Sequence, residues 1–448
     1  MAASCGLDVV LLDEAAAAGG QVWRAPFSGG VSDNRDGEAL RTRLAASRVD
    51  RVFGHRVWSV TDRFRVDAIG PDGPVGFEAP RLIAATGASE RVVPFPGWTL
   101  PGVVGLAATT VLLKSHGVLP GHRTLVAGCG PLLWAVAAGI LKAGGEVVAV
   151  VDRATKAEWA RILPLMATRP GLLVEGVSWL AALAQARVPV LSGQAIRSVA
   201  GDDRAAEAEI GPVGRDGAPC PVPTSRFAVD AVAVGDGLVP SGDIPRLLRA
   251  EQRFDRGRGG WVPVVDPEGR TSVPGLFAIG DGAGLRGAAP AVVAGRIAGL
   301  AAASDLGRIS EPDNRRRSAE EQSRLRRLMP FADAMSGMMA LRPAQAEAIA
   351  GGTVVCRCED VTRAEIDAAL DAGACEMNQI KAFTRCGMGP CQGRICGDVV
   401  AEIVAARVGD RERAGYWTAR PPLRPVPLGD LVGSFAYSDI PIPQPAPL

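Results

Sequence analysis

One segment in the middle of the sequence constrains the fold more than any other. An apolar run over 124–127 leads into a glycine turn at 128–131, an apolar helical pattern over 132–143 and a second apolar run over 146–151 that ends at Asp152. A glycine turn between a buried strand and a helix, with an acid ending the next strand, is typical of a Rossmann dinucleotide-binding unit. The alternation predicts a parallel sheet covered by helices, an α/β fold.

This unit departs from the usual glycine pattern in one place. Gly128 and Gly130 are candidate cofactor-binding residues, and Asp152 is placed to hold a ribose. Leu133 stands where the third glycine is expected, which should disturb the close packing of helix on strand. We therefore leave two hypotheses open: a site for NAD(P) or another adenine nucleotide, or a structural domain without hydride chemistry. Cys129 is predicted to be a small buried residue.

Three other strand ends carry residues typical of flavin binding. An acid at a strand end can bond the adenosine ribose, glycines allow close approach of the backbone, and an aspartate before a helix can bond a ribityl hydroxyl. The helix predicted over 288–295 would then direct its N-terminus at the pyrophosphate. The candidate cofactor-binding residues are Asp13, Glu14, Gly19, Gly20, Gln21, Thr86, Gly87, Gly280 and Asp281.

The first of these units is expected to be incomplete at its N-terminus. A GxGxxG turn should precede the ribose acid by about 20 residues, and residues 1–12 contain none. We expect the first strand and its glycine loop to be encoded upstream of Met1. The alternative is a chain that binds FAD weakly or not at all.

Cysteines near the C-terminus predict a metal centre. Cys356 and Cys358 form a CxC pair, and Cys391 and Cys396 form a second pair with four residues between them. Thiolates that converge from two segments are the ligands of iron–sulfur clusters, whereas a CxC pair fits a zinc knuckle poorly. Cys386 has the same spacing to Cys391 as Cys391 has to Cys396 and is a competitor for the fourth position.

Helix signals surround these cysteines. Thr362 and Glu365 form a capping box that begins a helix, and Gly373 is placed to end it. A second short helix is expected over 377–383 and a third over 395–404. The two cysteine pairs then lie on a loop before the first helix and at the start of the third. Cys375, beside Gly373, is expected to be structural.

The cysteine segment closely resembles the bacterioferritin-associated-ferredoxin-like [2Fe-2S] domain in the form fused to flavin dehydrogenases. The residues that carry this resemblance are 355–362 and 384–396. It implies a [2Fe-2S] cluster bound by Cys356, Cys358, Cys391 and Cys396. The CxxC second pair of the free ferredoxin is replaced here by a CxxxxC pair.

Over residues 6–430 the chain resembles the flavin-containing subunit of heteromeric amino-acid dehydrogenases. That group includes the α subunits of D-hydroxyproline and proline dehydrogenases, the A subunit of opine oxidase and the larger hydrogen cyanide synthase subunit. The resemblance implies FAD, a partner like D-amino-acid oxidase that oxidises a small amine at its C–N bond and, as an open question, a small ferredoxin-like subunit. Two alternatives are an NAD(P)H-dependent flavin reductase that feeds the cluster and a flavin-less assembly subunit.

Composition excludes several other classes of function. The net charge is +1, and the sequence shows no basic footprint for nucleic acid and no apolar run long enough to span a membrane. We expect a cytoplasmic protein, with peripheral attachment to a membrane through a partner left open. None of the three histidines, His55, His116 and His122, is a convincing catalytic base, so the catalytic residues stay unknown. This fits a chain that relays electrons while its partner oxidises the amine.

Together these patterns predict an α/β protein with two Rossmann-like domains and a small helical [2Fe-2S] domain. The predicted order is a flavin-binding part over 1–110, a second Rossmann domain over 111–230, the other flavin-binding part over 231–305, a helical linker over 306–350, the [2Fe-2S] domain over 351–410 and a proline-rich tail over 411–448.

Overall fold

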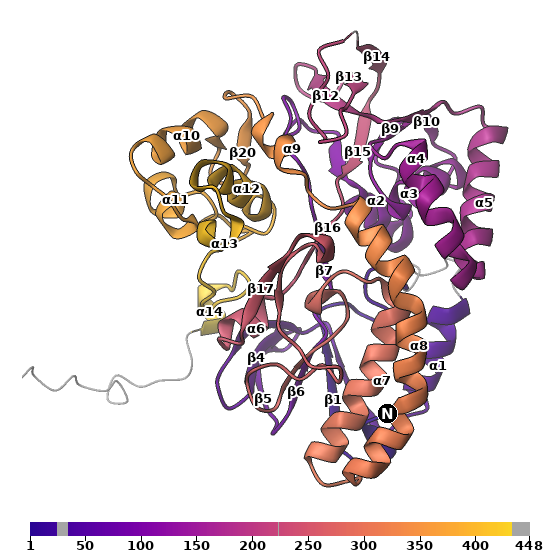
Figure 1. The fold of residues 1–448 in the computed structure, drawn as a ribbon, viewed down its shortest axis with the longest axis vertical. Helices are drawn as coiled ribbons and strands as arrows, with labels where there is room; N and C mark the ends of the chain where they lie inside the picture. The colour runs from indigo at the N-terminus through magenta and orange to yellow at the C-terminus, as the bar shows by residue number, and fades with distance from the viewer. Residues whose placement is uncertain (25–34, 223, 432–448) are drawn as a thin grey trace, which may run out of the picture.

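The computed structural model describes residues 1–24, 35–222 and 224–431. Two Rossmann-like units lie against each other, and a small helical domain formed by the C-terminal part of the chain stands beside them (Figure 1). The predicted α/β architecture is confirmed. None of the described helices combines the length and hydropathy needed to cross a lipid bilayer.

The second Rossmann unit contains the predicted βαβ segment. Strand β9 (Arg123–Gly128) leads into helix α3 (Pro131–Lys142) and strand β10 (Glu146–Asp152). The parallel sheet has the order β11-β10-β9-β15-β8, with β11 at Val190–Ser192, β15 at Ala231–Gly235 and β8 at Val103–Gly105. Strands β8 and β15 come from outside 111–230, so this unit is wider than the predicted boundaries.

We expected Leu133 to disturb the packing of helix α3 on the sheet, and the structure shows that it does not. Leu133 is fully buried and packs with Val126, Val136 and Ile140 between helix α3 and the sheet. The close approach that glycine normally permits is made instead by Gly128, where an added Cβ would lie 1.9 Å from the carbonyl oxygen of Gly235. Glycine at 128 is therefore what lets β9 and β15 end together.

The flavin-binding part has a divided sheet. Strand β1 (Val9–Asp13) pairs in parallel with β2 (Val49–Phe53), and β6 (Leu82–Ala84) pairs in parallel with β19 (Leu276–Ala278). Among the described residues, no strand joins these two pairs. An antiparallel ribbon flanks them, formed by β3 (Arg56–Val60), β4 (Arg65–Gly70) and β5 (Gly73–Glu78).

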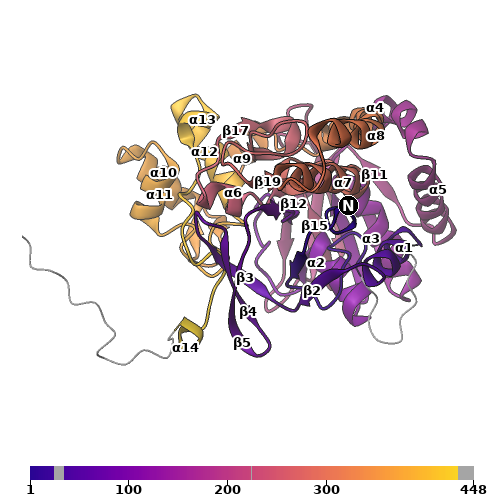
Figure 2. The ribbon, with the colours of Figure 1, turned by 90° about the horizontal axis from the view of Figure 1, so that it is seen from below.

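Two long helices run side by side along the flavin-binding part. Helix α7 (Ala288–Asp305) is followed by α8 (Glu311–Met338), and the two are adjacent in both views (Figures 1 and 2). The segment predicted to be a helical linker is occupied by α8 and the short α9 (Pro343–Glu347). The C-terminal end of α8 reaches the glycine turn of the second Rossmann unit.

The remaining elements connect these units. The helices are α1 (Arg35–Ala45), α2 (Leu106–Val111), α4 (Lys156–Ile162), α5 (Pro170–Gln185) and α6 (Asp243–Leu247). The strands are β7 (Ala88–Glu90), β12 (Gln194–Ala200), β13 (Glu207–Pro212), β14 (Ser225–Ala228), β16 (Leu238–Pro240), β17 (Gln252–Asp255) and β18 (Gly260–Pro263).

The cysteine domain has the helices that its sequence predicted. They are α10 (Arg363–Asp371), α11 (Met377–Thr384) and α12 (Gly397–Val408), preceded by the ribbon β20 (Val354–Cys356) and β21 (Val361–Thr362). The Thr362–Glu365 capping box is present, and Gly373 follows the helix with a φ of +101°. Helices α13 (Arg411–Ala414) and α14 (Leu428–Leu431) complete the described chain.

The core of this domain continues past the predicted boundary at 410. Trp417 is buried, and its indole donates a hydrogen bond to the carbonyl oxygen of Met377 at 3.0 Å. An added Cβ at Gly387, Gly393 or Gly397 would meet the indole ring within 3 Å. The start of the proline-rich tail is therefore part of the cysteine domain, and it holds the loop around the second cysteine pair in place.

Candidate functional site

A cavity of about 2860 Å³ lies at the divided sheet of the flavin-binding part. Its walls come from β1, β6, helices α7 and α8 and the start of α3. The structure brings most of the predicted flavin-binding residues to this one cavity. Those that line it are Asp13, Glu14, Gly19, Gly20, Gln21, Thr86, Gly87 and Asp281, whereas Gly280 lies directly before the last of them and does not line it.

The two acids at the end of β1 have different surroundings. The Asp13 carboxylate accepts a hydrogen bond from the Ala15 amide at 2.9 Å, and burial raises its pKa. The Glu14 side chain is largely exposed and lies 3.6 Å from the Arg56 guanidinium. A polar ligand gains more from a partly buried acid than from one in water, because water competes less for its hydrogen bonds. Asp13 is the better candidate for a ribose.

Asp281 shapes the turn in front of helix α7. Its Oδ1 accepts hydrogen bonds from the backbone amides of Arg286 at 2.8 Å and Gly287 at 2.7 Å. Gly287 stands directly before the first residue of α7. The remaining carboxylate oxygen has no hydrogen bond among the described residues. That Asp281 binds a hydroxyl group beside a helix N-terminus stays a prediction, and this oxygen is the one available for it.

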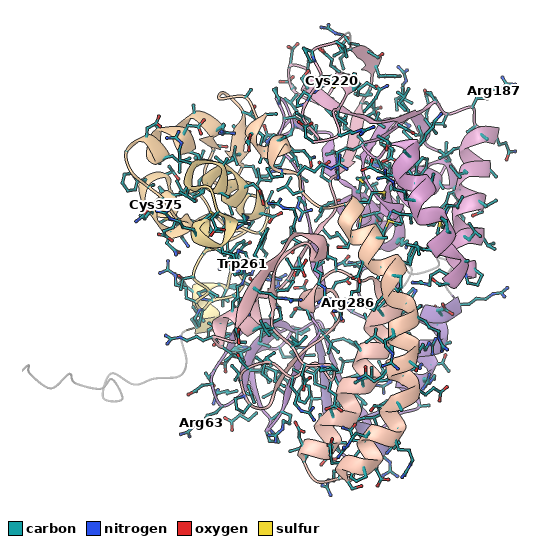
Figure 3. The ribbon with its side chains drawn as sticks, in the orientation of Figure 1. Arg63, Arg187, Cys220, Trp261, Arg286 and Cys375 are labelled. Carbon is teal, nitrogen blue, oxygen red and sulfur yellow. The ribbon has the colours of Figure 1, made fainter. Side chains whose placement is uncertain are left out.

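Cationic side chains line the same cavity. They come from separate parts of the chain: Arg24, Arg35, Arg56, Arg81, Lys114, Arg169, Arg286, Arg308, Arg324, Arg327 and Arg424. Arg286 appears near the middle of the view in Figure 3, and burial lowers the pKa of its guanidinium. Its Nε atom is buried without a hydrogen-bond partner among the described residues. Acidic residues line the same cavity, so its charge is mixed. The buried Arg286 Nε is the cationic group that suits an anionic ligand such as a pyrophosphate.

Sequence reasoning missed Glu90, on β7 at the cavity wall. Its Oε1 accepts a hydrogen bond from the Ala107 amide at 2.8 Å, at the start of helix α2. Burial raises the pKa of Glu90 to about 7. An added Cβ would lie 2.0 Å from this carboxylate at Gly105 and 2.6 Å at Gly235. Those two glycines make room for it, a relation between distant segments that the sequence alone does not display.

In the second Rossmann unit, the glycine turn is in contact with the end of the linker helix. An added Cβ at Gly130 would lie 2.3 Å from the Sδ atom of Met339. The carbonyl oxygen of Met338 accepts hydrogen bonds from the Cys129 thiol at 3.7 Å and from Arg153 at 3.4 Å. Cys129 is buried, as predicted, and burial raises its pKa to about 12.

Asp152, the predicted ribose acid of this unit, is fully buried. One carboxylate oxygen accepts the Ala154 amide at 2.9 Å, and the other accepts the indole N–H of Trp159 at 2.6 Å. Burial raises the pKa of Asp152 to about 6. Both oxygens are thus bonded within the chain. Neither Asp152 nor the two glycines of the turn line the large cavity.

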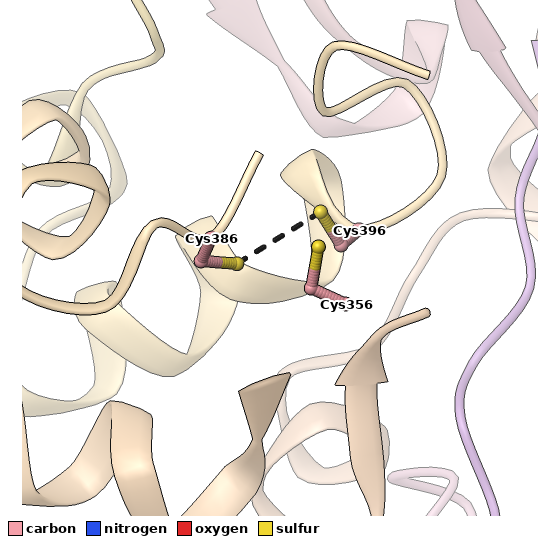
Figure 4. Close-up of side chains that lie close together, drawn as sticks. All are labelled: Cys356, Cys386 and Cys396. Atoms are coloured by element: carbon pink, nitrogen blue, oxygen red, sulfur yellow. Dashed lines mark hydrogen bonds between the residues drawn. The ribbon is translucent and has the colours of Figure 1, made fainter. Parts of the chain in front are cut away.

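The thiols of the C-terminal domain converge, with a change from the predicted set. Cys356, Cys386 and Cys396 are buried, and their sulfur atoms all lie within 4.8 Å of one another (Figure 4). The Cys386 and Cys396 sulfurs are 3.9 Å apart. Sequence reasoning gave Cys386 only the role of a competitor, whereas the fold places it in the innermost group.

The other two predicted ligands form a neighbouring pair. Cys358 and Cys391 are half-buried, and the Cys391 thiol lies within hydrogen-bonding reach of Cys358. Close approach here depends on Gly389, where an added Cβ would lie 2.2 Å from the Cβ of Cys358. Cys375 is exposed and lies outside this group (Figure 3).

Ion pairs connect the thiol group to the cavity. Arg394 lies between Cys391 and Cys396, and its guanidinium is 3.0 Å from the carboxylate of Asp243, which lines the cavity. Arg246 and Arg424 also pair with Asp243. Burial alone would raise the pKa of the Asp243 carboxyl. The three neighbouring guanidiniums have the larger effect, so the pKa of Asp243 is lowered.

A second contact between the domains is more deeply buried. Arg91, next to Glu90, forms an ion pair with Asp398 of helix α12 at 2.7 Å, and both side chains are less than a tenth exposed. Arg411 pairs with the same Asp398 at 3.3 Å. Removing one partner of a buried pair leaves an uncompensated charge. The cysteine domain is therefore held in one position against the flavin-binding part.

Comparison with known proteins agrees with this architecture. Residues 1–305 match the pyridine nucleotide-disulphide oxidoreductase family, and residues 350–434 match the sarcosine oxidase A3 domain. A crystal structure of L-proline dehydrogenase from P. horikoshii superposes with a TM-score of 0.68 at 19% identity, covering 96% of this chain and 76% of that chain. That likeness concerns the fold.

Two curated relatives match nearly the whole sequence. The A subunit of opine oxidase from Rhizobium meliloti is 33% identical over 95% of this chain and 93% of its own length. The hydrogen cyanide synthase subunit HcnB of Pseudomonas aeruginosa is 32% identical, over 94% of this chain and 93% of its own.

The fold and the cavity therefore define an FAD-dependent oxidoreductase with two dinucleotide-binding units. More particularly, the chain belongs to the pyridine nucleotide-disulphide oxidoreductase family, in the group that contains HcnB and the A subunit of opine oxidase.

Proposed function

We propose that this chain is the FAD and [2Fe-2S] electron-transfer subunit of a heteromeric dehydrogenase or oxidase that acts on the C–N bond of an amino acid or opine. The partner, a flavoprotein like D-amino-acid oxidase, would oxidise the small amine. The names of the relatives, which are subunits of opine oxidase and hydrogen cyanide synthase, support this substrate class.

The observation that carries the proposal is the direct link between thiol group and cavity. Arg394 comes from the loop between Cys391 and Cys396, and its partner Asp243 belongs to the cavity wall. Electron transfer needs two redox centres held at a fixed separation. The buried Arg91–Asp398 pair supplies that rigidity through a second contact between the same two domains.

The cavity residues fit FAD. Asp13 would hold the adenosine ribose, Asp281 would hold a ribityl hydroxyl, and Gly287 with the N-terminus of α7 would face the pyrophosphate. The buried Nε of Arg286, which has no hydrogen-bond partner among the described residues, favours the phosphate charges. When bound, FAD supplies the change between two-electron and one-electron transfer.

The thiols fit an iron–sulfur cluster. Four cysteine thiolates bind a [2Fe-2S] centre, and our proposed ligands are Cys356, Cys358, Cys391 and Cys396. The close triad and the neighbouring pair bring all four to one place together with Cys386. A zinc site would need a single tetrahedron of ligands and would carry no electron.

No histidine among the described residues is a convincing catalytic base for amine oxidation. His116 and His122 are exposed, and His55, which lines the cavity, bonds the carbonyl oxygen of Phe53 through Nδ1 at 2.8 Å. An electron-transfer role needs no such base in this chain. The second Rossmann unit offers little support for an NAD(P)H reductase, because both Asp152 oxygens are already bonded.

The proposal is tested by purifying the chain together with its partner under anaerobic conditions. We expect flavin, iron and acid-labile sulfide in the complex, with about two irons per chain of this protein. Adding candidate D-amino acids, proline or opines should bleach the flavin and produce the EPR signal of a reduced cluster. A complex that contains flavin on the partner alone and no iron would overturn the proposal and leave an assembly role.

A further inference from the structure

The thiol pocket holds five cysteines where a [2Fe-2S] cluster takes four. They divide into the half-buried pair Cys358 and Cys391 and the buried triad Cys356, Cys386 and Cys396. Each iron of such a cluster takes two protein thiolates. The pair is enough for one iron, so three thiols remain for the two positions on the other iron.

Within the triad, Cys386 and Cys396 are held by separate helix ends. Cys386 follows helix α11, where Arg385 adopts a φ of +63° and Gly387 a φ of +83°. Its backbone amide donates a hydrogen bond to the Thr384 hydroxyl at 3.1 Å. Cys396 stands directly before the first residue of α12. Both sulfurs therefore reach the pocket through fixed backbone geometry.

Burial of a small side chain alone does not account for the position of the Cys386 sulfur. It is fully buried, and its sulfur is 3.9 Å from that of Cys396, a separation typical of two thiolates on one metal ion. The pair of Cys358 and Cys391 has no comparable third thiol, since the triad that lies within 4.8 Å includes neither of them. The triad therefore has one thiol more than its iron needs, whereas the pair has none to spare.

From this arrangement we propose that Cys386 is an alternative cluster ligand that exchanges with Cys396 on the same iron. The inference rests on the proposed iron–sulfur function and concerns which thiols carry it. In the exchange, one Fe–S bond to Cys396 breaks and one to Cys386 forms. The incoming thiol releases a proton and the departing thiolate takes one up, so the cluster keeps its charge and no oxidant is consumed.

The experiment compares serine variants in the anaerobically purified complex with its partner. Cys386→Ser and Cys396→Ser are each expected to retain most of the iron and sulfide, and the double variant is expected to lose them roughly tenfold or more. Cys396→Ser should also show a visible and EPR spectrum distinct from that of the unaltered complex, because Cys386 then binds the iron.

Two controls make the comparison specific. Cys391→Ser should lose the cluster as a single variant, since the pair has no third thiol, and Cys375→Ser should change nothing, since that thiol is exposed and outside the pocket. The melting temperature of each variant reports whether the domain keeps its packing, including that of Trp417 over the Cys391–Cys396 loop.

The outcomes separate the inference from the function beneath it. If Cys396→Ser loses iron as completely as the double variant while Cys386→Ser has the unaltered spectrum, Cys386 is a bystander and the exchange is wrong, although the cluster stands. If the unaltered complex contains no iron, the proposed function fails and the exchange fails with it. A variant that loses iron and also melts at a lower temperature is replaced by the matching alanine, which is judged by the same criteria.

Discussion

The two Rossmann-like units of this protein use the same kinds of residue in opposite ways. In the flavin-binding part, Asp281 bonds two amides through one oxygen and faces a cavity of about 2860 Å³. In the second unit, Asp152 is fully buried with both oxygens bonded to its own chain, and Met339 lies against Gly130. The acid of the first unit faces the cavity, whereas the acid of the second unit is bonded within its own chain and does not line the cavity.

This difference teaches what a glycine turn and a strand-end acid are able to predict. The motif fixes the backbone, because glycines are needed wherever strands and helix approach closely. It does not fix whether a ligand uses the acid, since a nearby donor such as Trp159 satisfies the same carboxylate. Whether the site is open depends on what packs over the turn, here the end of helix α8.

The largest effect expected from this contrast is on flavin retention. Asp281→Ala should reduce the flavin bound per chain roughly tenfold or more, because the turn before α7 loses the acceptor of two amides and the cavity loses the carboxylate that we propose binds a ribityl hydroxyl. Asp281→Asn keeps an acceptor for the amides and should lose less. Asp152→Ala in the second unit should leave flavin content unchanged. The measurement is flavin absorbance per protein after gel filtration.

A flavin content that falls in Asp152→Ala as much as in Asp281→Ala would break the contrast. The melting temperature of each variant is measured in parallel, so that loss of flavin is distinguished from loss of fold.

The next effect concerns pyridine nucleotides. We expect neither NADH nor NADPH to bleach the flavin within seconds, because both oxygens of Asp152 are bonded within the chain and Met339 lies against Gly130. Trp159→Phe removes the indole donor while keeping an aromatic ring, and it is expected to release one Asp152 oxygen without exposing the glycine turn, since Met339 stays in place. Stopped-flow absorbance of the flavin is the measurement. Rapid bleaching of the unaltered protein would restore the NAD(P)H-reductase hypothesis.

Much of the fold was predictable because it depends on residues that lie close together in the sequence. The βαβ segment, the Thr362–Glu365 capping box and the helix begun after Cys396 all depend on residues close in sequence. Most of the predicted flavin residues also line one cavity, although the strands that precede them belong to two separate sheets.

What the sequence did not reveal depends on contacts between distant segments. Glu90 becomes a buried acid only because Gly105 and Gly235 leave space for it. Cys386 joins the thiol triad because of two residues with positive φ around it, one of which is an arginine. The core of the cysteine domain passes residue 410 because Trp417 returns over three glycines. None of these relations has a local signature.

The smallest expected effect is on the pH dependence of stability, and it distinguishes the two units by their acids. Burial raises the pKa of Glu90 to about 7 and that of Asp152 to about 6, above ordinary values of 4.5 and 3.8. An acid whose pKa is raised by folding stabilises the fold below its unfolded pKa, and that contribution is lost as the pH rises through the folded pKa. Each acid contributes up to about 3 kcal/mol to the free energy of unfolding, and less where water enters the cavity.

We therefore expect the free energy of unfolding to fall between about pH 4 and 7 as these acids ionise, with a shallower slope in Glu90→Gln and in Asp152→Asn. The slope is the readout, because an amide at 152 replaces one acceptor by a donor and lowers the absolute stability. Removing flavin should change the contribution of Glu90, which lines the cavity, and leave that of Asp152 unchanged. Denaturant titrations of holoprotein and flavin-free protein measure this. Equal sensitivity of both acids to flavin would mean that the second unit is as open to the cofactor as the first.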